Sequence, residues 1–321
     1  MSVGLWLRRR VGYPVEAFVV YAAYLLMGAL PVTWSSALYG TLGRVIGPHL
    51  PTTARARRNL TRAFPDKSAA EIETIVRGMW ENLGRTVGEY PRLRDLWDDS
   101  LAEQVLAVGI EHFANLPAER RPAVLRGRHV EVVGIENFLE MRDDGEAALV
   151  FSAHYGNWEM LALGAARFGL DLSVLFRTPN NPYVARLLKR LRRGMGALLP
   201  KGVEGAIASV KVISRGGHLG MLVDQKLNRG IAVPFFGRPA MTSPTLARLA
   251  YRFRCPVYGA YVQRLSGTQF RIVMSPRLDL PDIADEEAFV EELTARVTAT
   301  VEEWICAHPE QWFWLHRRWP D

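Results

Sequence analysis

A strongly apolar run at residues 147–151 leads directly into the polar segment Ser-Ala-His-Tyr-Gly-Asn-Trp-Glu at residues 152–159. Short apolar runs bounded by turn residues are typical of strands that are buried on both faces of a sheet. Gly156 and Asn157 are residue types that favour a tight turn. A buried strand, a turn and then a helix form the repeating unit of α/β proteins, so this segment strongly constrains the fold class.

Further apolar runs repeat this pattern along the chain. Candidate strands lie at residues 130–135, 147–152, 172–176, 219–223, 256–263 and 270–275, and helical stretches separate most of them. Strands that alternate with helices predict a largely parallel sheet. The last two candidates are joined by Leu-Ser-Gly-Thr, a short link typical of an antiparallel hairpin. We therefore predict an α/β fold with a mixed, mainly parallel sheet flanked by helices.

Residues 51–146 are expected to be mainly helical. Ser68 with Glu71 forms a capping box, in which each side chain satisfies a backbone N–H at a helix start. Apolar residues then recur at the helical period until Pro91, which ends the helix. A closing amphipathic helix is expected at residues 286–305.

The N-terminal region predicts a membrane anchor. Residues 11–30 are almost wholly apolar and follow three consecutive arginines, and a second apolar stretch covers residues 32–46. The uninterrupted part, residues 17–30, is shorter than the roughly 20 residues that a straight span needs. A short hairpin, a tilted span and a surface anchor stay open, and an uncleaved anchor is favoured over a signal peptide. We expect an anchor at residues 1–51 and a catalytic domain at residues 52–321.

The charge of the chain indicates acidic partners. The chain has 321 residues and a formal net charge of +7, and its basic residues cluster at positions 8–10, 55–58, 189–193 and 317–318. Nucleic-acid-binding motifs do not accompany these clusters, so anionic lipid or an acidic carrier protein fits better. The two cysteines and the scattered histidines show no metal-ligand spacing, and we expect no metal and no bound cofactor.

His154 and Glu159 are the first candidates for catalysis. An imidazole titrates near neutrality, and a carboxylate beside it can fix its tautomer and stabilise the proton that it accepts. Because the two residues are five positions apart, they converge only if His154 lies in the turn and Glu159 in the first helical coil. The same pattern also fits a buried histidine that is satisfied by a local carboxylate.

Polar residues follow two other predicted strands. Arg177 comes after the strand at residues 172–176, and Asp224 and Gln225 come after the strand at residues 219–223. Ligands of open α/β sheets bind at the carboxyl ends of the strands. Arg177 suits a phosphate or an oxyanion, whereas Asp224 either holds Arg177, binds substrate or caps a helix.

Two further segments are candidates for substrate contacts. Residues 183–193 are expected to form a helix with five cations and no acidic residue, which suits an acidic protein or lipid phosphates. Residues 231–244 form an apolar loop with a sharp turn, which either lines an acyl channel or is a phenylalanine-rich core.

Taken together, these segments resemble the late acyltransferases of lipid A biosynthesis, which add lauroyl or myristoyl chains. Broader glycerolipid acyltransferases usually have Asp where this chain has Glu159, so the chain is most similar to the lipid A branch. The resemblance covers nearly the whole chain and is carried by His154 to Glu159, Asn82-Leu83-Gly84-Arg85 with Glu89, Asp224-Gln225, Val233-Pro234-Phe235-Phe236-Gly237 and Pro309-Glu310-Gln311-Trp312-Phe313-Trp314-Leu315-His316-Arg317-Arg318-Trp319.

The resemblance implies a set of site residues. It assigns His154 and Glu159 to a catalytic dyad, in which His154 is the base and Glu159 orients it. Asp224 and an arginine in the helix after the Asn-Pro loop, which corresponds best to Arg192, match further functional positions of the family. Arg177 or Arg192 would bind an acceptor phosphate or stabilise an oxyanion, and Gln225 is expected to bind substrate with Asp224.

The resemblance also implies the reaction and its place in the cell. An acyl chain would pass from the thioester of acyl carrier protein to a hydroxyl of a hydroxyacyl chain on a lipid A precursor, at the cytoplasmic face of the inner membrane. Ser152 lacks the Gly-x-Ser-x-Gly setting of a covalent nucleophile, which favours direct transfer. The alternatives are an acyl-CoA-dependent glycolipid acyltransferase of the phosphatidylinositol mannoside type, a catalytically silent membrane-surface protein and a lipid hydrolase.

Overall fold

The computed structural model describes residues 8–97, 99–107, 109 and 124–320. Within these residues, one sheet has eight strands in the order β1-β2-β10-β9-β3-β6-β4-β5. The strands are β1 (Val124–Arg126), β2 (Val130–Val133), β3 (Leu149–Ser152), β4 (Leu172–Phe176), β5 (Leu198–Pro200), β6 (His218–Leu222), β9 (Val257–Ser266) and β10 (Gln269–Arg277).

The sheet is mixed and mainly parallel, as predicted. Strands β9, β3, β6, β4 and β5 run in the same direction, and β10 pairs antiparallel with β9. A strand lies at each of the six predicted positions, and the predicted range of β4 is confirmed to the residue. Because neighbouring parallel strands end at the same edge, the segments that follow β3, β6, β4 and β5 meet there.

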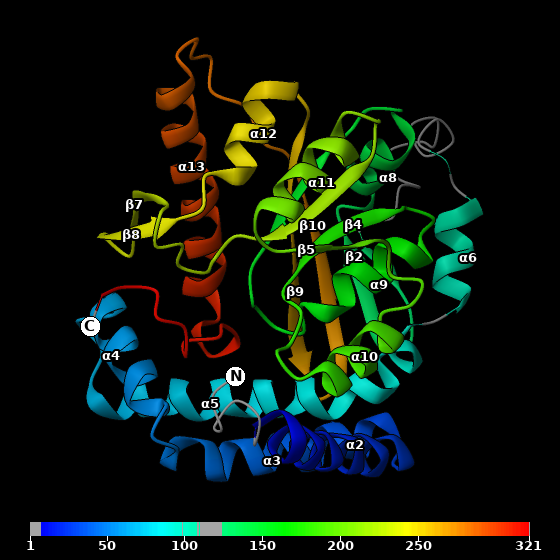
Figure 1. Ribbon diagram of the computed structural model, residues 1–321, viewed down its shortest axis with the longest axis vertical. Helices are drawn as coiled ribbons and strands as arrows, with labels where there is room; N and C mark the ends of the chain where they lie inside the picture. The colour runs from blue at the N-terminus through cyan, green and yellow to red at the C-terminus, as the bar shows by residue number, and fades with distance from the viewer. Residues whose placement is uncertain (1–7, 98, 108, 110–123, 321) are drawn as a thin grey trace.

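Helices cover both faces of the sheet and one end of the molecule (Figure 1). The long helix α13 lies beside α12, whereas α2, α3 and α5 form a layer below the sheet in this view. The α-helices are α2 (Tyr13–Ala29), α3 (Val32–Ile46), α4 (Thr53–Ala63), α5 (Ala69–Glu89), α6 (Asp99–Ala107), α8 (Ile135–Asp143), α9 (Glu159–Arg167), α10 (Pro182–Leu191), α11 (Val203–Ile213), α12 (Thr245–Phe253) and α13 (Glu286–Ala307).

Several helix predictions are confirmed and two are refined. The capping box at Ser68 and Glu71 begins α5, and the closing helix is α13. The region 51–146 is mainly helical where it is described, but it also contains β1 and β2, and its residues 110–123 lie outside the described part of the chain. The predicted basic helix is α10, which ends at Leu191 and leaves Arg192 just beyond it.

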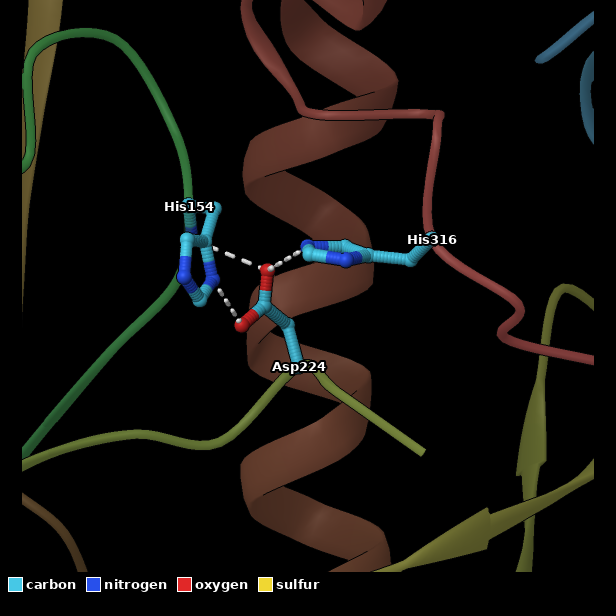
Figure 2. A group of neighbouring side chains, drawn as sticks. All are labelled: His154, Asp224 and His316. Carbon is cyan, nitrogen blue, oxygen red and sulfur yellow. Dashed lines mark hydrogen bonds and ion pairs between the residues drawn. The ribbon is translucent and has the colours of Figure 1, made fainter. Parts of the chain in front are cut away.

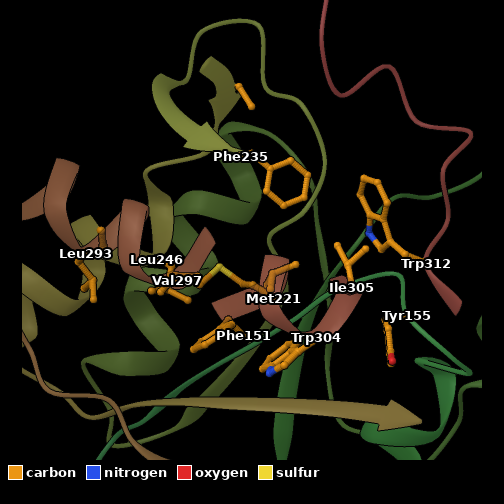
Figure 3. Close-up of a cluster of buried hydrophobic side chains, with 14 of the residues drawn as sticks. Phe151, Tyr155, Met221, Phe235, Leu246, Leu293, Val297, Trp304, Ile305 and Trp312 are labelled. Carbon is orange, nitrogen blue, oxygen red and sulfur yellow. The ribbon is translucent and has the colours of Figure 1, made fainter. Parts of the chain in front are cut away.

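The central strands are buried on both faces. Leu149 and Phe151 of β3 belong to one apolar cluster, and the alternate residues Ala148 and Val150 belong to the cluster on the other side. Figure 3 shows Phe151 in the first cluster, next to Trp304 of α13, whose ring stacks on it at 5.5 Å. This two-sided burial explains why the run at residues 147–151 is continuously apolar.

The predicted apolar loop at residues 231–244 is a two-stranded hairpin. Strand β7 (Ile231–Phe235) pairs antiparallel with β8 (Arg238–Thr242) in a small separate sheet. The rings of Trp312 and Trp319 lie 5.7 and 5.5 Å from the ring of the buried Phe235. Of the two interpretations left open by the sequence, the phenylalanine-rich core is therefore the one that the structure supports.

The two N-terminal helices contact the rest of the molecule. Helix α3 lies so close to α5 that a Cβ on Gly84 would come within 2.1 Å of the Tyr39 carbonyl oxygen. The segment Arg10–Ala29 is a helix of 20 residues that is long and apolar enough to cross a membrane. The predicted boundary between residues 51 and 52 falls in the turn before α4, and the division into anchor and catalytic domain stays a prediction.

Candidate active site

His154 lies in the tight turn that follows β3. Gly156 makes this turn possible, because its φ is +57° and an added Cβ would lie 1.7 Å from the Val262 carbonyl oxygen. The C-terminal tail holds the turn through two backbone hydrogen bonds, from Gly156 N–H to the Gln311 carbonyl and from Phe313 N–H to the His154 carbonyl. His154 is therefore held in place by residues of the C-terminal tail.

Asp224 is the carboxylate that orients His154 (Figure 2). Its Oδ1 lies 2.8 Å from His154 Nδ1, and its Oδ2 accepts a hydrogen bond of 2.9 Å from the His154 backbone N–H. Asp224 follows β6, which is the direct neighbour of β3. A carboxylate at Nδ1 favours the tautomer that carries its proton there, which leaves a lone pair on Nε2 to accept a proton.

The prediction that Glu159 orients the imidazole is wrong. Glu159 begins α9, and both of its carboxylate oxygens bind Nη2 of Arg192, at 2.5 and 2.7 Å. The Tyr90 hydroxyl donates a further hydrogen bond to Glu159. His154 lies in the turn and Glu159 begins α9, as convergence requires, but Arg192 and Tyr90 bind the Glu159 carboxylate and the imidazole does not.

Arg192 is held firmly by its surroundings. Besides Glu159, its Nε donates to the Tyr90 hydroxyl at 3.1 Å, and its guanidinium lies 4.4 Å from the centre of the Phe176 ring. Burial is the largest single effect and lowers the pKa of Arg192, but the charges and hydrogen bonds of Glu159 and Tyr90 together outweigh it and raise the pKa. Arg192 therefore stays a cation in this pair. Arg177, in contrast, is exposed just after β4.

Asp224 stays ionised although it is fully buried. Burial alone raises the pKa of a carboxyl, but the charge and the hydrogen bonds of His154 pull the pKa of Asp224 well below its usual range. Trp312 Nε1 donates a further hydrogen bond of 2.8 Å to Oδ2. An ionised carboxylate of this kind stabilises the imidazolium that forms when His154 accepts a proton.

The role of the C-terminal tail at Asp224 does not follow from the sequence pattern. The structure brings Trp312 and His316 there, and His316 Nε2 lies 3.9 Å from Asp224 Oδ2 (Figure 2). Burial is the main cause that lowers the pKa of His316 to about 4, so this ring is neutral near neutral pH. The many tryptophan and histidine residues after the closing helix indicate that the tail packs against the protein, but they do not predict which residues it contacts.

Gln225 lies at the outer nitrogen of the base. Its amide Nε2 is 3.2 Å from His154 Nε2, and its Oε1 accepts a hydrogen bond of 3.2 Å from Lys201 Nζ. Lys201, which no sequence motif marks as a site residue, follows β5. Gln225 and Lys201 thus border the atom at which proton transfer would occur.

The site can act as a general base toward a hydroxyl group. Among the described residues, His154, Asp224 and His316 offer ligand atoms within 4.8 Å of one another, close enough for a metal ion. Both Asp224 oxygens, however, already accept N–H donors from His154 and Trp312, an arrangement that serves an imidazole base. The Oγ of Ser152 is buried, which does not suit a nucleophile.

Comparisons with known proteins agree with this chemistry. Residues 7–131 and 127–321 match the family described as bacterial lipid A biosynthesis acyltransferase. The lipid A biosynthesis myristoyltransferase of Escherichia coli K12 is 24% identical over 306 residues, which cover 93% of this chain and 85% of that protein. The lauroyltransferase of the same organism is 26% identical over 270 residues, which cover 81% and 76%.

One relative acts on a different glycolipid. The phosphatidylinositol mannoside acyltransferase of Mycolicibacterium smegmatis is 26% identical over 246 residues, which cover 74% of this chain and 77% of that protein. The family match nevertheless extends over nearly the whole chain. The protein is therefore an acyltransferase that belongs to the bacterial lipid A biosynthesis acyltransferase family.

Proposed function

We propose that this protein transfers a lauroyl or myristoyl chain from the thioester of acyl carrier protein to a hydroxyl of a hydroxyacyl chain on a lipid A precursor. The observation that carries the proposal is the pair formed by Asp224 and His154, with hydrogen-bond partners that leave the lone pair of the imidazole on Nε2. This pair lies at the carboxyl edge of the sheet, where ligands of such folds bind.

The reaction is a direct transfer. His154 Nε2 takes the proton of the acceptor hydroxyl while the hydroxyl oxygen attacks the thioester carbonyl carbon. The electron pair of the carbonyl moves to its oxygen, and Asp224 stabilises the imidazolium. When the intermediate collapses, the C–S bond breaks and the thiolate takes the proton from Nε2. The acyl thioester is a co-substrate, and this chemistry needs no metal and no bound cofactor.

Charge favours both partners of this reaction. Helix α10 carries exposed Arg186, Lys189 and Arg190, and it follows the loop that begins with Arg177. Acyl carrier protein is acidic, and a lipid A precursor carries phosphates. Arg177 and Gln225 lie beyond the ends of β4 and β6, and we assign them to substrate contacts, whereas Asp224 holds His154 and Arg192 is bound by Glu159.

We further propose that the N-terminal helices lie in the surface of the inner membrane, at its cytoplasmic face, rather than crossing it. Helix α2 is bonded to the body at both of its ends: Asn181 donates to the Tyr13 carbonyl at 2.9 Å, and Arg92 donates to the Gly28 carbonyl at 2.9 Å. A helix that crossed the bilayer would carry these polar partners into hydrocarbon, which is costly. The outward faces of α2 and α3 expose Val15, Phe18, Val19, Leu25, Leu26, Trp34, Leu38, Leu42, Val45 and Ile46, and Val11 is exposed just before α2.

The decisive experiment is an acyl-transfer assay with purified protein and a defined lipid A precursor, in which lauroyl and myristoyl thioesters of acyl carrier protein are compared with those of coenzyme A. We expect the acceptor to gain the mass of one acyl chain with the carrier-protein donor, and His154→Ala to abolish the gain. Preference for coenzyme A thioesters and phosphatidylinositol mannosides would favour the glycolipid alternative. Release of fatty acid without an acceptor would indicate a hydrolase, and transfer that is independent of His154 would contradict the assigned base.

A further inference from the structure

Three hydrogen bonds connect Lys201 to the catalytic histidine and its carboxylate. Lys201 Nζ donates to Gln225 Oε1 at 3.2 Å, the Gln225 amide nitrogen lies 3.2 Å from His154 Nε2, and His154 Nδ1 lies 2.8 Å from Asp224 Oδ1. When His154 carries its proton on Nδ1, the three bonds form a consistent chain: Lys201 donates to Gln225, the Gln225 N–H donates to the lone pair of His154 Nε2, and His154 Nδ1–H donates to Asp224. In this state the Gln225 amide covers the atom that must accept the proton of the substrate.

The positions of these side chains follow from the sheet. His154, Gln225 and Lys201 come after β3, β6 and β5, whose carboxyl ends share one edge. The acceptor hydroxyl can approach Nε2 only if the Gln225 amide moves away. Since Lys201 is exposed and Gln225 is half-buried, both side chains border the space in which the hydroxyl and the thioester must meet.

Lys201 differs from Arg192, another cation near the site. The guanidinium of Arg192 is bound by both oxygens of Glu159, so its charge is already neutralised. The hydrogen-bond partner of Lys201 is a neutral amide, which leaves its positive charge available to a substrate. Partial burial and the nearby Arg177 lower the pKa of Lys201, whereas the charge of Asp224 opposes this change. A cation that no carboxylate neutralises favours a developing negative charge beside it.

We propose that Lys201 and Gln225 form the oxyanion-stabilising pair of this acyltransferase. When the acceptor hydroxyl displaces the Gln225 amide from His154 Nε2, the amide N–H and the Lys201 ammonium turn to the carbonyl oxygen of the acyl thioester. The new O–C bond then forms, the hydroxyl proton passes to Nε2, and the two donors bind the oxygen that receives the carbonyl electron pair. The C–S bond breaks next, and the leaving thiolate takes the proton. This inference rests on the proposed acyl transfer.

Substitutions of Lys201 test the pair in the acyl-transfer assay. Removing one oxyanion donor typically costs about 100-fold or more in kcat, so we expect a loss of this order in Lys201→Met with KM little changed for either substrate. Lys201→Arg should recover part of the loss, because it restores a cationic donor. Lys211→Met, which removes an exposed lysine on α11, is the matched control and should retain the wild-type kcat.

Gln225→Leu tests the covering of Nε2. In the absence of substrates, we expect diethyl pyrocarbonate to modify His154 faster in this variant than in the wild type, as measured by peptide mass spectrometry. Two results would overturn the proposed pair, provided that the wild type transfers acyl chains. One is an unchanged kcat in Lys201→Met, and the other is a Lys201→Met variant in which only the KM for the acceptor rises. An unchanged rate of His154 modification would overturn the covering of Nε2. Failure of the wild type to transfer any acyl chain would instead refute the proposed function.

Discussion

Asp224 makes two hydrogen bonds with His154: its Oδ1 lies 2.8 Å from the ring Nδ1, and its Oδ2 lies 2.9 Å from the backbone nitrogen. Glu159 makes its own pair with Arg192, at 2.5 Å. The site thus contains two separate pairs. Asp224 with His154 forms the pair that would accept the substrate proton, and Glu159 with Arg192 forms an ion pair that joins α9 to the residue following α10. The two pairs should respond differently to substitution.

We expect Asp224→Asn to lower kcat by about 10³ to 10⁴-fold, because an amide neither stabilises the imidazolium nor fixes the tautomer with a proton on Nδ1.

Glu159→Gln should lower kcat through its effect on Arg192, so the double variant Glu159→Gln/Arg192→Met should lose no more activity than the more damaging of the two single variants. Combining Glu159→Gln with Asp224→Asn should give losses that multiply. Steady-state acyl transfer measures all five proteins, and a non-additive effect between Asp224 and Glu159 would contradict two separate pairs.

The local part of the site could be predicted from the sequence. The apolar run before His154 indicates a strand buried on both faces, and the residues after it indicate a turn, which together place the histidine at the sheet edge. The position of Asp224 at the same edge follows by the same argument. The short strands β1 and β5 were missed because three residues give too little pattern. The β7–β8 hairpin was missed because proline, present in both strands, disfavours strand structure.

The partner of His154 could not be predicted, because it depends on the order of the strands in the sheet. Asp224 lies 70 positions further along the chain and reaches the imidazole only because β6 is the direct neighbour of β3. His316 reaches the same carboxylate because the C-terminal tail returns to the turn after β3. Spacing along the chain favours Glu159 as the partner of His154. The order of the strands, which brings Asp224 to the imidazole instead, cannot be read from the sequence.

A buried ion pair between Glu89 and Arg264 should be important for stability. The two residues are joined at 2.5 and 3.0 Å, Glu89 is fully buried, and Asn157 of the catalytic turn donates to the same carboxylate. We expect Glu89→Gln to lower the free energy of unfolding by about 3 to 5 kcal/mol, because it leaves a buried guanidinium without its counter-charge. Urea unfolding of the purified protein measures the change.

The matched control for this prediction is the exposed pair of Glu292 and Arg296 on α13, whose side chains are 43% and 42% exposed. Glu292→Gln should change the free energy of unfolding by less than about 1 kcal/mol, because water screens an exposed pair. If the two substitutions cost the same, burial is not what makes the Glu89 pair important.

The outward face of the N-terminal helices should determine membrane binding. Phe18 and Trp34 are 75% and 69% exposed, and we expect the double variant Phe18→Glu/Trp34→Glu to lose binding to anionic lipid vesicles in sedimentation, with an unchanged unfolding midpoint. Val203→Glu, which places the same charge on an apolar residue of α11 that is 78% exposed, should bind as the wild type does.

The orientation of α2 can be measured in the same vesicles. A helix that lies in the membrane surface leaves an N-terminal label on the outside when protein is added to preformed vesicles. We therefore expect an external protease to remove the label completely. Protection of the label inside the vesicle would show that α2 crosses the bilayer and would contradict the in-plane arrangement.

His316 should make stability depend on pH in the acidic range. Burial is the main cause that lowers the pKa of His316 to about 4, with smaller contributions from His154, Arg318 and Lys201, whereas Asp224 opposes the change. A histidine in the unfolded chain titrates near pH ~6.5, so between these two values the unfolded state binds a proton that the folded state does not.

The free energy of unfolding should therefore fall as the pH falls from ~6.5 to about 4, by a His316 contribution of up to about 3 kcal/mol. The lowered pKa of Asp224 adds its own loss only below the usual value of 3.8, outside this window. We expect His316→Gln to have a shallower slope than the wild type in urea unfolding at pH 7, 6, 5 and 4.5, because glutamine does not titrate. Equal slopes in the two proteins would show that His316 takes up its proton in the folded state as readily as in the unfolded chain.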